Sequence, residues 1–300
     1  MDFLRVGDLG TDGLADVLET AAAVKRDREA TRGARSGLRV GLFFEKPSTR
    51  TRVSCEVATT ELGGIPVVLK QDEVGLGSRE AVEDVARVLD RYLDVLAFRV
   101  FHHRDLDTVA AHAAAPVINL LSDLEHPCQA LADLQTLAEA MPLPGATIAY
   151  VGDGNNVCAS LMIAGAAMGV SMRVAGPGAY QPAEAILATA HAIAAPGVEI
   201  TVTDDPERAV AGADAVYADV WASMGQESEA TDRRAIFAPY RVDEHLFGMA
   251  GPNAIFLHCL PAHRGDEVTD GVIDHERSRV FDQAENRLHA FKALLLHLTR

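Results

Sequence analysis

The sequence of 300 residues predicts an α/β fold with two parallel-sheet domains, and three observations support this prediction. Apolar runs of strand length alternate with helical segments along the chain, as they do where helices cover a parallel sheet. The length is typical of two domains. A stretch rich in proline and glycine, 141–146, interrupts the alternation near the middle of the chain. We therefore expect two α/β halves of comparable size that meet near residue 140.

The first half opens with an amphipathic helix over 11–25, for which Thr11 offers a capping hydroxyl. A second helix follows Ser48 and is expected to stop before the Gly-Gly pair at 63–64, because glycine commonly ends helices. The stretch 71–80 is rich in Asp, Gly and Ser, which predicts a loop. The other expected elements of this half are strands at 38–44, 65–70, 95–100 and 116–122, and helices at 81–92, 105–114 and 126–140.

The second half repeats the alternation of strands and helices. Residues 154–172 carry no charge, and the stretch is nearly long enough to span a bilayer. It begins Gly-Asn-Asn and contains two further glycines, which favours a buried helix packed on a sheet. The expected strands are 147–151, 172–177, 198–203, 215–220 and 255–263, and the other expected helices are 183–194, a short one before 215, and 281–300.

Composition and charge restrict the possible partners. The chain has 27 basic and 43 acidic residues and a net charge of −16, which disfavours binding to nucleic acid and to anionic membranes. An anionic ligand then needs a local cluster of arginine, histidine and backbone N–H groups. Four cysteines without a CxxC pair, and the absence of a secretory leader at the start, predict a cytoplasmic protein with reduced thiols.

The strongest chemical signal is Ser48-Thr49-Arg50-Thr51-Arg52, which lies between a predicted strand and the first turn of a helix. Ligands bind at this edge of open α/β sheets. Ser48 can cap the helix, and the N–H groups of its first turn favour an anion. Two arginines at a helix N-terminus oppose the helix dipole, which is easier to explain with an anion bound between their guanidiniums. The alternative is an ordinary Ser-capped helix with solvated arginines.

Two more strand ends in the first half are followed by polar side chains. Arg99 ends one strand, and the next strand leads to a helix start formed by His126, Pro127, Cys128 and Gln129. Proline suits the first helical position. Considered alone, each residue has a simpler interpretation. Arg99 would be an ordinary surface arginine, and His126 would be a half-exposed neighbour of a helix cap. Because the carboxyl ends of parallel strands meet at one edge, we expect these residues and the Ser-Thr-Arg motif to face one crevice.

The segment GDGNN at 152–156 follows a strand, as a dinucleotide-binding loop does. A nucleotide-dependent dehydrogenase is nevertheless disfavoured, because the third glycine of that motif is missing and the next strand ends without an acidic residue for the ribose. Asn155 and Asn156 at a helix start suit a carboxylate or amide ligand, and simple capping of the helix is the alternative for Asn155.

Polar residues also follow the later strands. Asp219 ends one strand before a loop with Ser223 and Met224, and it can pair with an ammonium group or lie in an ordinary turn. His258 and Cys259 follow another strand. Neighbouring strand residues point to opposite faces, so His258 is poorly placed to activate Cys259 as a nucleophile, and the alternative for Cys259 is a small buried hydrophobic residue. The irregular spacing of acids and histidines in this region argues against a metal site.

These motifs, in this order and at these separations, resemble the aspartate/ornithine carbamoyltransferase family. STRTR and HPCQ are common to both branches, whereas DVWASMG at 219–225 and HCLP at 258–261 point to the ornithine branch. The resemblance implies a carbamoyl phosphate-binding domain, 1–140, to which a C-terminal helix, 282–300, crosses back. It also implies an ornithine-binding domain, 141–281, and subunits that form trimers or assemblies of trimers with active sites at their interfaces.

The resemblance further implies a reaction and a role for each matching residue. The carbamoyl group passes from carbamoyl phosphate to the δ-amine of L-ornithine, giving L-citrulline, with no metal and no cofactor. Arg50, Arg99, His126 and Cys259 are then the catalytic residues. The residues expected around carbamoyl phosphate are Ser48, Thr49, Arg50, Thr51, Arg99, His126, Pro127, Cys128, Gln129, Cys259, Leu260 and Arg287, and those expected to hold ornithine are Asn156, Asp219, Ser223 and Met224.

One position departs from the family pattern. Gly75 stands where such enzymes usually offer a glutamine to the neighbouring subunit, and Ser78 and Arg79 are nearby substitutes. Two alternatives to ornithine carbamoylation stay open. One is a carbamoyltransferase for a related amine, such as acetylated ornithine or putrescine. The other is a non-catalytic binding protein with the same fold.

Overall fold

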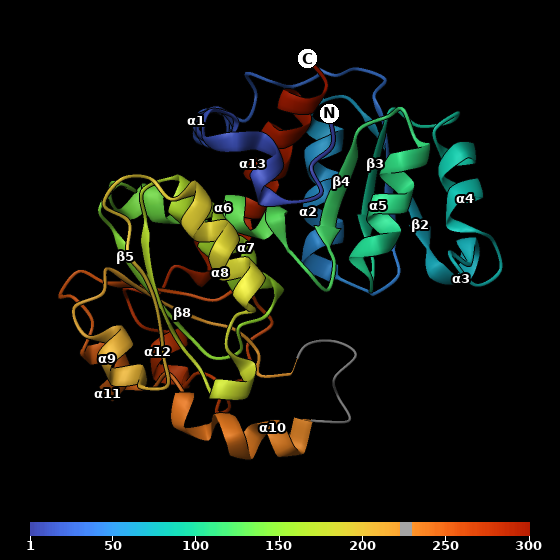
Figure 1. Cartoon of the computed structure of the whole chain (residues 1–300). Helices are drawn as coiled ribbons and strands as arrows, with labels where there is room; N and C mark the ends of the chain where they lie inside the picture. Colours follow the sequence, from blue (N-terminus) through green and yellow to red (C-terminus); the bar gives the residue numbers. More distant parts are fainter. Residues whose placement is uncertain (223–229) are drawn as a thin grey trace. The chain divides into compact units, whose positions relative to one another are not determined.

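The computed structural model describes residues 1–222 and 230–300, which form two compact α/β units. The first unit comprises residues 1–132 and 285–300, and the second comprises 133–284. The chain leaves the first unit within α6 (Pro127–Ala140) and returns to it within α13 (Val280–Leu298). Figure 1 follows this path along the sequence. Two parallel-sheet domains and a C-terminal helix that joins the first of them are thus confirmed.

The first unit is built on four parallel strands in the order β2-β1-β3-β4. Central β1 and β3 are almost entirely buried, whereas the edge strand β2 is only partly covered. Phe44 at the end of β1 lies opposite Lys70 of β2 and Arg99 of β3, so the carboxyl ends of these strands are level. The strands are β1 (Arg39–Phe44), β2 (Ile65–Lys70), β3 (Val95–Arg99) and β4 (Val117–Leu121).

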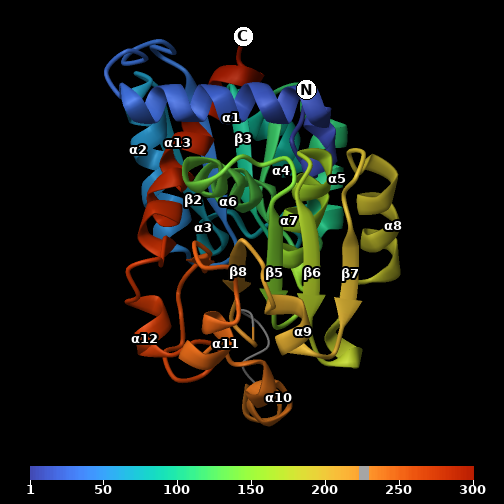
Figure 2. The ribbon, with the colours of Figure 1, turned by 90° about the vertical axis from the view of Figure 1, so that its left-hand side faces the viewer.

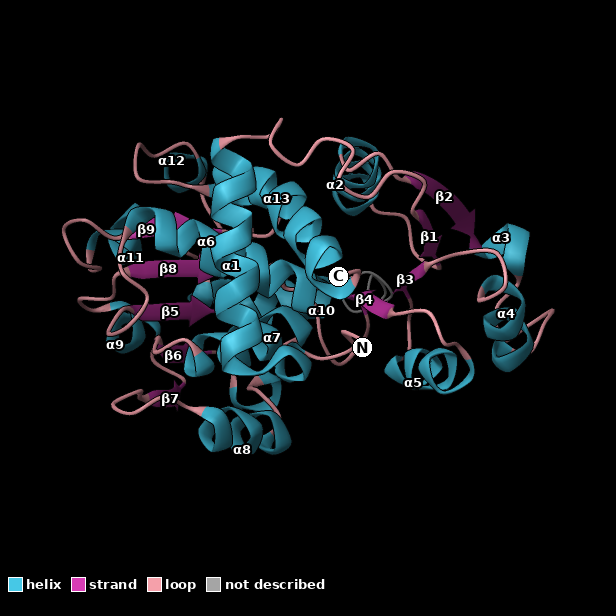
Figure 3. Ribbon diagram, turned by 90° about the horizontal axis from the view of Figure 1, so that it is seen from above, coloured by secondary structure: helices cyan, strands magenta, loops and turns pink. Residues whose placement is uncertain are grey.

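Helices pack against this sheet and against one another. α4 and α5 lie beside this sheet in Figure 1. Their side chains Val85 and Leu106 share one apolar core with Phe43 and Phe98 of the sheet. α1 lies alongside α13 (Figure 3), where Asp16 pairs with His297 at 2.7 Å. The helices are α1 (Gly10–Arg26), α2 (Thr49–Glu61), α3 (Gln71–Val74), α4 (Val82–Leu89) and α5 (His103–His112), preceded by a 3-10 turn, η1 (Val6–Leu9).

Two local expectations for the first unit are wrong. Thr11 does not cap α1, because the helix continues from η1 and Leu9 takes the cap position without a side-chain hydrogen bond. The expected loop at 71–80 begins with the one-turn helix α3, which ends at Gly75 with a φ of 69°. A Cβ atom on Gly75 would lie 2.6 Å from the Cβ of Arg79, so this turn requires glycine where the family pattern has glutamine.

The second unit is built on five parallel strands in the order β7-β6-β5-β8-β9. Figure 2 shows β7, β6, β5 and β8 side by side. Val151 at the end of β5 lies opposite Ala175 and Ala218, so strand ends are again level at one edge. The strands are β5 (Thr147–Val151), β6 (Ser171–Ala175), β7 (Ile200–Thr203), β8 (Ala215–Ala218) and β9 (Ile255–Leu257).

The uncharged stretch of the second half forms α7 (Asn156–Ala167), and all of its residues after Asn156 are buried. The prediction of a buried helix on a sheet is therefore correct, and none of the described helices has the length and apolarity needed to cross a bilayer. Val210, Phe247 and Ile273 from three short helices fill a core with Phe256 of β9. The other helices are α8 (Glu184–Ile193), α9 (Pro206–Val210), α10 (Ala230–Phe237), α11 (Glu244–Gly248) and α12 (Asp270–Ile273), with 3-10 turns at Gly178–Tyr180 and Ala238–Tyr240.

Candidate functional site

The predicted helix start at Ser48 is confirmed. Ser48 has an extended backbone and caps α2, because its Oγ accepts a hydrogen bond from the backbone N–H of Thr51 at 3.4 Å. The Ser48 hydroxyl also donates to Thr51 Oγ1 at 3.0 Å. Thr49 is exposed and Arg50 half-buried, whereas Arg52 is exposed and paired with Glu56 at 2.7 Å. The first turn of α2 therefore presents its N–H groups just beyond the end of β1, an arrangement that favours an anion.

Arg287 on α13 joins two other elements of the first unit. Its Nη2 donates to Thr51 Oγ1 on α2 at 3.1 Å, and its Nη1 donates to Gln129 Oε1 on α6. All three side chains are at least 95% buried. Both terminal nitrogens of the guanidinium are thus fixed by neutral acceptors. These acceptors do not compensate its positive charge.

Arg99 is buried at the end of β3, and its backbone is tied to β1 through Glu45. The N–H of Glu45 donates to the carbonyl of Arg99 at 2.9 Å, and the Glu45 carboxylate accepts from the backbone N–H of Phe101 at 2.6 Å. Burial raises the pKa of the Glu45 carboxyl, while the Phe101 N–H opposes that shift. Sequence analysis assigned no role to Glu45, which lies three residues before Ser48.

His126 immediately precedes α6 and is buried in the first unit. Burial holds the pKa of its imidazole well below the usual range, and the positive charges of Arg287 and Arg99 act in the same direction. At neutral pH the ring is therefore uncharged and offers one N–H donor, which suits a carbonyl oxygen.

The turn that carries His126 is held by a small polar network. Asn119 on β4 donates to Ser122 Oγ at 3.2 Å and to the carbonyl of Glu125 at 3.3 Å. The Glu125 carboxylate in turn accepts from the backbone N–H of Val6 at 2.9 Å. Each of these polar side chains is buried, so the network restricts the turn directly before His126.

Two buried cysteines of the first unit have raised pKa values. Burial raises the pKa of the Cys128 thiol to about 12, and the thiol donates to the carbonyl of Asn119 at 3.4 Å. Burial also raises the pKa of Cys55 far above its ordinary value. Both stay protonated at neutral pH, so neither is a nucleophile. Pro127 occupies the first position of α6, as predicted, and Cys128 the second.

In the second unit, Asn155 connects the start of α7 with the end of β8. Its side-chain oxygen accepts from the backbone N–H groups of Val157 and Cys158 at 2.9 and 3.2 Å, which caps the helix. Its side-chain N–H donates to Asp219 Oδ2 at 2.7 Å. The Asn155 side chain therefore caps α7 and also holds Asp219. Sequence analysis had treated capping and a role in a binding site as alternatives.

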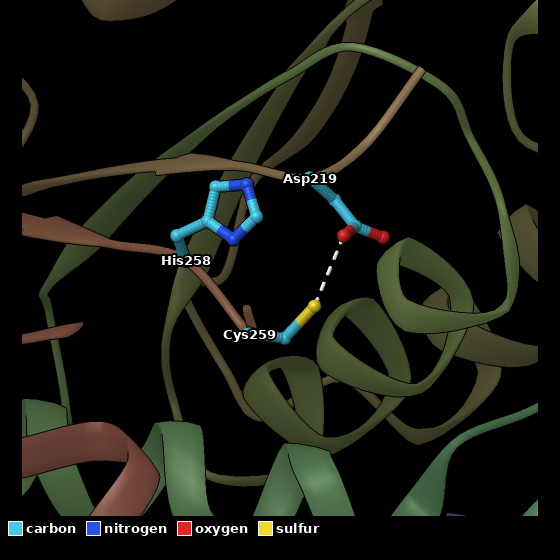
Figure 4. A group of neighbouring side chains, drawn as sticks. All are labelled: Asp219, His258 and Cys259. Carbon is cyan, nitrogen blue, oxygen red and sulfur yellow. Dashed lines mark hydrogen bonds between the residues drawn. The ribbon is translucent and has the colours of Figure 1, made fainter. Parts of the chain in front are cut away.

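The other carboxylate oxygen of Asp219 meets Cys259. The Cys259 thiol donates to Asp219 Oδ1 at 3.0 Å, and Figure 4 shows the sulfur directed at that carboxylate. Asp219 is almost completely buried, and Cys259 is partly accessible. Leu260 follows with a φ of 58°. Two neutral donors, an amide and a thiol, thus orient one buried acid.

His258 does not activate Cys259. Its Nδ1 accepts the backbone N–H of Leu260 at 2.9 Å, so its Nε2 carries the proton and donates to Glu267 at 3.1 Å. Ligand atoms of Asp219, His258 and Cys259 lie within 4.8 Å of one another, which resembles a metal site. Both His258 nitrogens are nevertheless engaged in hydrogen bonds, so the imidazole has no lone pair to offer a metal ion.

The structure gathers the predicted residues into two sets, one in each unit. Ser48, Thr51, Arg99, His126, Gln129 and Arg287 belong to the first, and Asn156, Asp219, Cys259 and Leu260 to the second. Ser223 and Met224 lie outside the described residues. Asn156 is half-buried at the first position of α7.

Comparisons with known proteins identify a family over both halves of the chain. The carbamoyl-P binding domain of aspartate/ornithine carbamoyltransferases matches residues 1–139, and the Asp/Orn binding domain matches 144–298. Two curated relatives, the ornithine carbamoyltransferases of Acidothermus cellulolyticus and Synechocystis, are 52% and 49% identical, over 99% of this chain and 96% of theirs.

Solved structures give the same result. The ornithine carbamoyltransferase from Pyrococcus furiosus has a TM-score of 0.94 at 47% identity, covering 98% of this chain and 95% of that one. An acetylornithine transcarbamylase complexed with acetylcitrulline has a TM-score of 0.90 at 30% identity, covering 99% of both chains. With matches this extensive in both halves, the chain belongs to the aspartate/ornithine carbamoyltransferase family.

Proposed function

We propose that this protein is an ornithine carbamoyltransferase, which transfers the carbamoyl group of carbamoyl phosphate to the δ-amine of L-ornithine and releases L-citrulline and phosphate. The observation that carries this proposal is the identity of about half of all positions with ornithine carbamoyltransferases over nearly the full chain. We assign carbamoyl phosphate to residues 1–140 with helix 282–300, and ornithine to residues 141–281.

Carbamoyl phosphate binds at the start of α2. Ser48, Thr49, Arg50 and Thr51 hold the phosphate, with Arg99 and Arg287 supplying positive charge. Gln129 and the start of α6, with Pro127 and Cys128, complete this set. Neutral His126 donates its N–H to the carbamoyl oxygen, on which negative charge develops as the amine attacks. A preorganised donor of this kind contributes about 3 to 4 kcal/mol to transition-state stabilisation.

Ornithine binds at the buried acid of the second unit. Asp219 pairs with the α-ammonium group, and Asn156 with Ser223 and Met224 holds the rest of the α-amino acid head. Cys259 and the backbone of Leu260 position the reacting amine. Because the Cys259 thiol donates to Asp219, it is arranged to orient groups and not to form a covalent intermediate.

The attacking amine must first lose a proton. An ordinary alkylammonium has a pKa of about 10.4, so deprotonation near pH 7.4 costs about 4 kcal/mol. Arginines around the phosphate (Arg50, Arg99 and Arg287) disfavour a second positive charge beside the carbamoyl carbon and so reduce that cost. Holding both substrates in line adds an entropic advantage. Phosphate is a good leaving group, so the residues present are sufficient without a cofactor.

We also propose that the protein is a homo-oligomer, a trimer or an assembly of trimers, in the cytoplasm. Edge strand β2 of the first sheet is only partly covered, and Ile65 and Val53 in that unit are each more than half exposed. Exposed apolar side chains on a partly covered edge strand and on a helix of the same unit suit an interface between copies. Four cysteines, with no disulfide among them, fit a reducing compartment.

Phosphate release from carbamoyl phosphate, measured with a panel of amines, tests the substrate assignment. We expect kcat/KM for L-ornithine to exceed that for N-acetylornithine and putrescine by at least about a hundredfold, because a buried carboxylate discriminates strongly against a missing ammonium group. Faster turnover of acetylornithine would assign the protein to the other branch represented among its structural neighbours. Faster turnover of putrescine would show that Asp219 does not recognise the α-amino group.

A further inference from the structure

We infer that Arg233 and Asp153 form a buried clip that sets the spacing of the two chain segments of the ornithine site, so that both are positioning residues for this substrate. The inference rests on the proposed function. It concerns residues of the second unit to which the sequence analysis assigned no role and that lie beside the residues proposed to touch ornithine.

The clip joins the same two segments as Asn155 and Asp219. Asp153 lies in the turn between β5 and α7, and its carbonyl accepts the backbone N–H of Asn155 at 2.8 Å. Arg233 on α10 donates from Nη1 to Asp153 Oδ2 at 2.7 Å and to the carbonyl of Trp221 at 2.9 Å. Trp221 follows Asp219 by two residues. One nitrogen therefore bridges the turn before α7 and the segment after β8.

Burial distinguishes this pair from the surface ion pairs. The Arg233 and Asp153 side chains are 7% and 11% exposed, and the guanidinium lies over the Tyr180 ring at 4.7 Å. Burial raises the pKa of the Asp153 carboxyl and Arg233 opposes that shift. The next residue, Arg234, pairs with Asp266 but is 66% exposed. Loss of one partner from a buried pair leaves an uncompensated charge, whereas loss of an exposed pair has little effect.

Two parallel bridges thus connect these segments, the Asn155–Asp219 hydrogen bond and the clip. Without the clip, Asn155 still links the start of α7 to Asp219 at the end of β8, but the segment after Asp219 loses its hydrogen bond to Arg233. The position of Asp219 relative to Asn156 is then less tightly restricted, so the ornithine head meets a less preorganised site. Carbamoyl phosphate contacts the first unit in the proposed function, so its binding should not change.

Steady-state kinetics with each substrate varied in turn test this inference. We expect Arg233→Met to raise KM for ornithine at least about tenfold while KM for carbamoyl phosphate changes less than about twofold. Arg233→Lys should recover much of the loss, because a single ammonium nitrogen can donate to both acceptors. The matched control, Arg234→Met, removes an exposed guanidinium from the same helix and should behave as the wild type.

Circular dichroism and thermal melting establish that each variant is folded. If Arg233→Met does not fold, Asp153→Asn serves instead, since it keeps an acceptor for Arg233 but removes the charge, and a selective rise in KM for ornithine is again expected. Equal changes in both KM values, or kinetics of Arg233→Met that match Arg234→Met, would overturn the inference. Absence of ornithine-dependent phosphate release in the wild type would instead overturn the proposed function, and the inference with it.

Discussion

The substrate-binding regions proposed for the two units use opposite charges but the same construction. In the first unit, buried Arg287 donates to the neutral acceptors Thr51 and Gln129. In the second, buried Asp219 accepts from the neutral donors Asn155 and Cys259. Within the described part of the chain, neither Arg287 nor Asp219 has a salt-bridge partner of opposite charge. Arg233 and Asp153 show the contrasting arrangement, a buried pair whose charges compensate each other.

This difference indicates where substrate charge is required. A buried charge held only by neutral dipoles is costly unless a counter-charge arrives. In the proposed function, phosphate supplies that counter-charge for Arg287, and the α-ammonium of ornithine supplies it for Asp219. The clip needs no substrate because it is already neutral as a pair. Substitutions should therefore affect substrate binding at Arg287 and Asp219 through charge, and at the clip through geometry alone.

The largest effect is expected from Arg287→Lys. Two different nitrogens of the guanidinium bind two different acceptors, and a lysine has one nitrogen, so the fork cannot be reproduced. We expect kcat/KM for carbamoyl phosphate to fall by about a hundredfold or more in initial-rate measurements. Arg300→Lys is the matched control, because Arg300 is exposed and pairs with Asp16. Activity within about threefold of wild type in Arg287→Lys would show that charge alone suffices.

A smaller effect is expected from Cys259→Ser. Serine keeps a donor for Asp219 Oδ1 but its shorter side chain alters the geometry of that hydrogen bond, now 3.0 Å long. We expect KM for ornithine to rise by about tenfold with substantial turnover retained, because a hydrogen bond of ordinary strength is weakened and not lost. Cys55→Ala, a buried thiol outside the site, is the control. Detection of a carbamoylated Cys259 by mass spectrometry of the working enzyme would contradict the positioning role.

The features predictable from sequence are those with local causes. The Ser48 cap and the buried α7 depend on residues close in the chain, and both are confirmed. Asn155 and Asp219 are 64 positions apart, and Asp153 and Arg233 are 80 apart. Contacts at such separations depend on strand order, which alternation of strands and helices does not specify. Arg287 was singled out only through family resemblance, since its contact with Thr51 spans 236 positions.

The smallest effect is expected at His126. Its imidazole should stay uncharged over the pH range in which most histidines titrate. Burial, with Arg287 and Arg99, holds the pKa of His126 well below the ordinary value of about 6.5. The pH dependence of KM for carbamoyl phosphate should therefore contain no step from ionisation of this imidazole between about pH 6 and 8. In an NMR titration, the ring signal of His126 is the one that is lost in His126→Asn. Its chemical shift should stay constant over that pH range.

The same histidine should make the free energy of unfolding depend on pH, although KM should not depend on its ionisation. Below about pH 6.5 the unfolded chain binds a proton at His126 that the folded protein does not bind. The free energy of unfolding must therefore fall as pH decreases, by up to about 1.4 kcal/mol per pH unit for this site. His126→Asn should reduce that slope in urea titrations at several pH values. An unchanged slope would mean that His126 is already protonated in the folded protein, and that the first unit carries one more positive charge than the comparison of the two halves assumes.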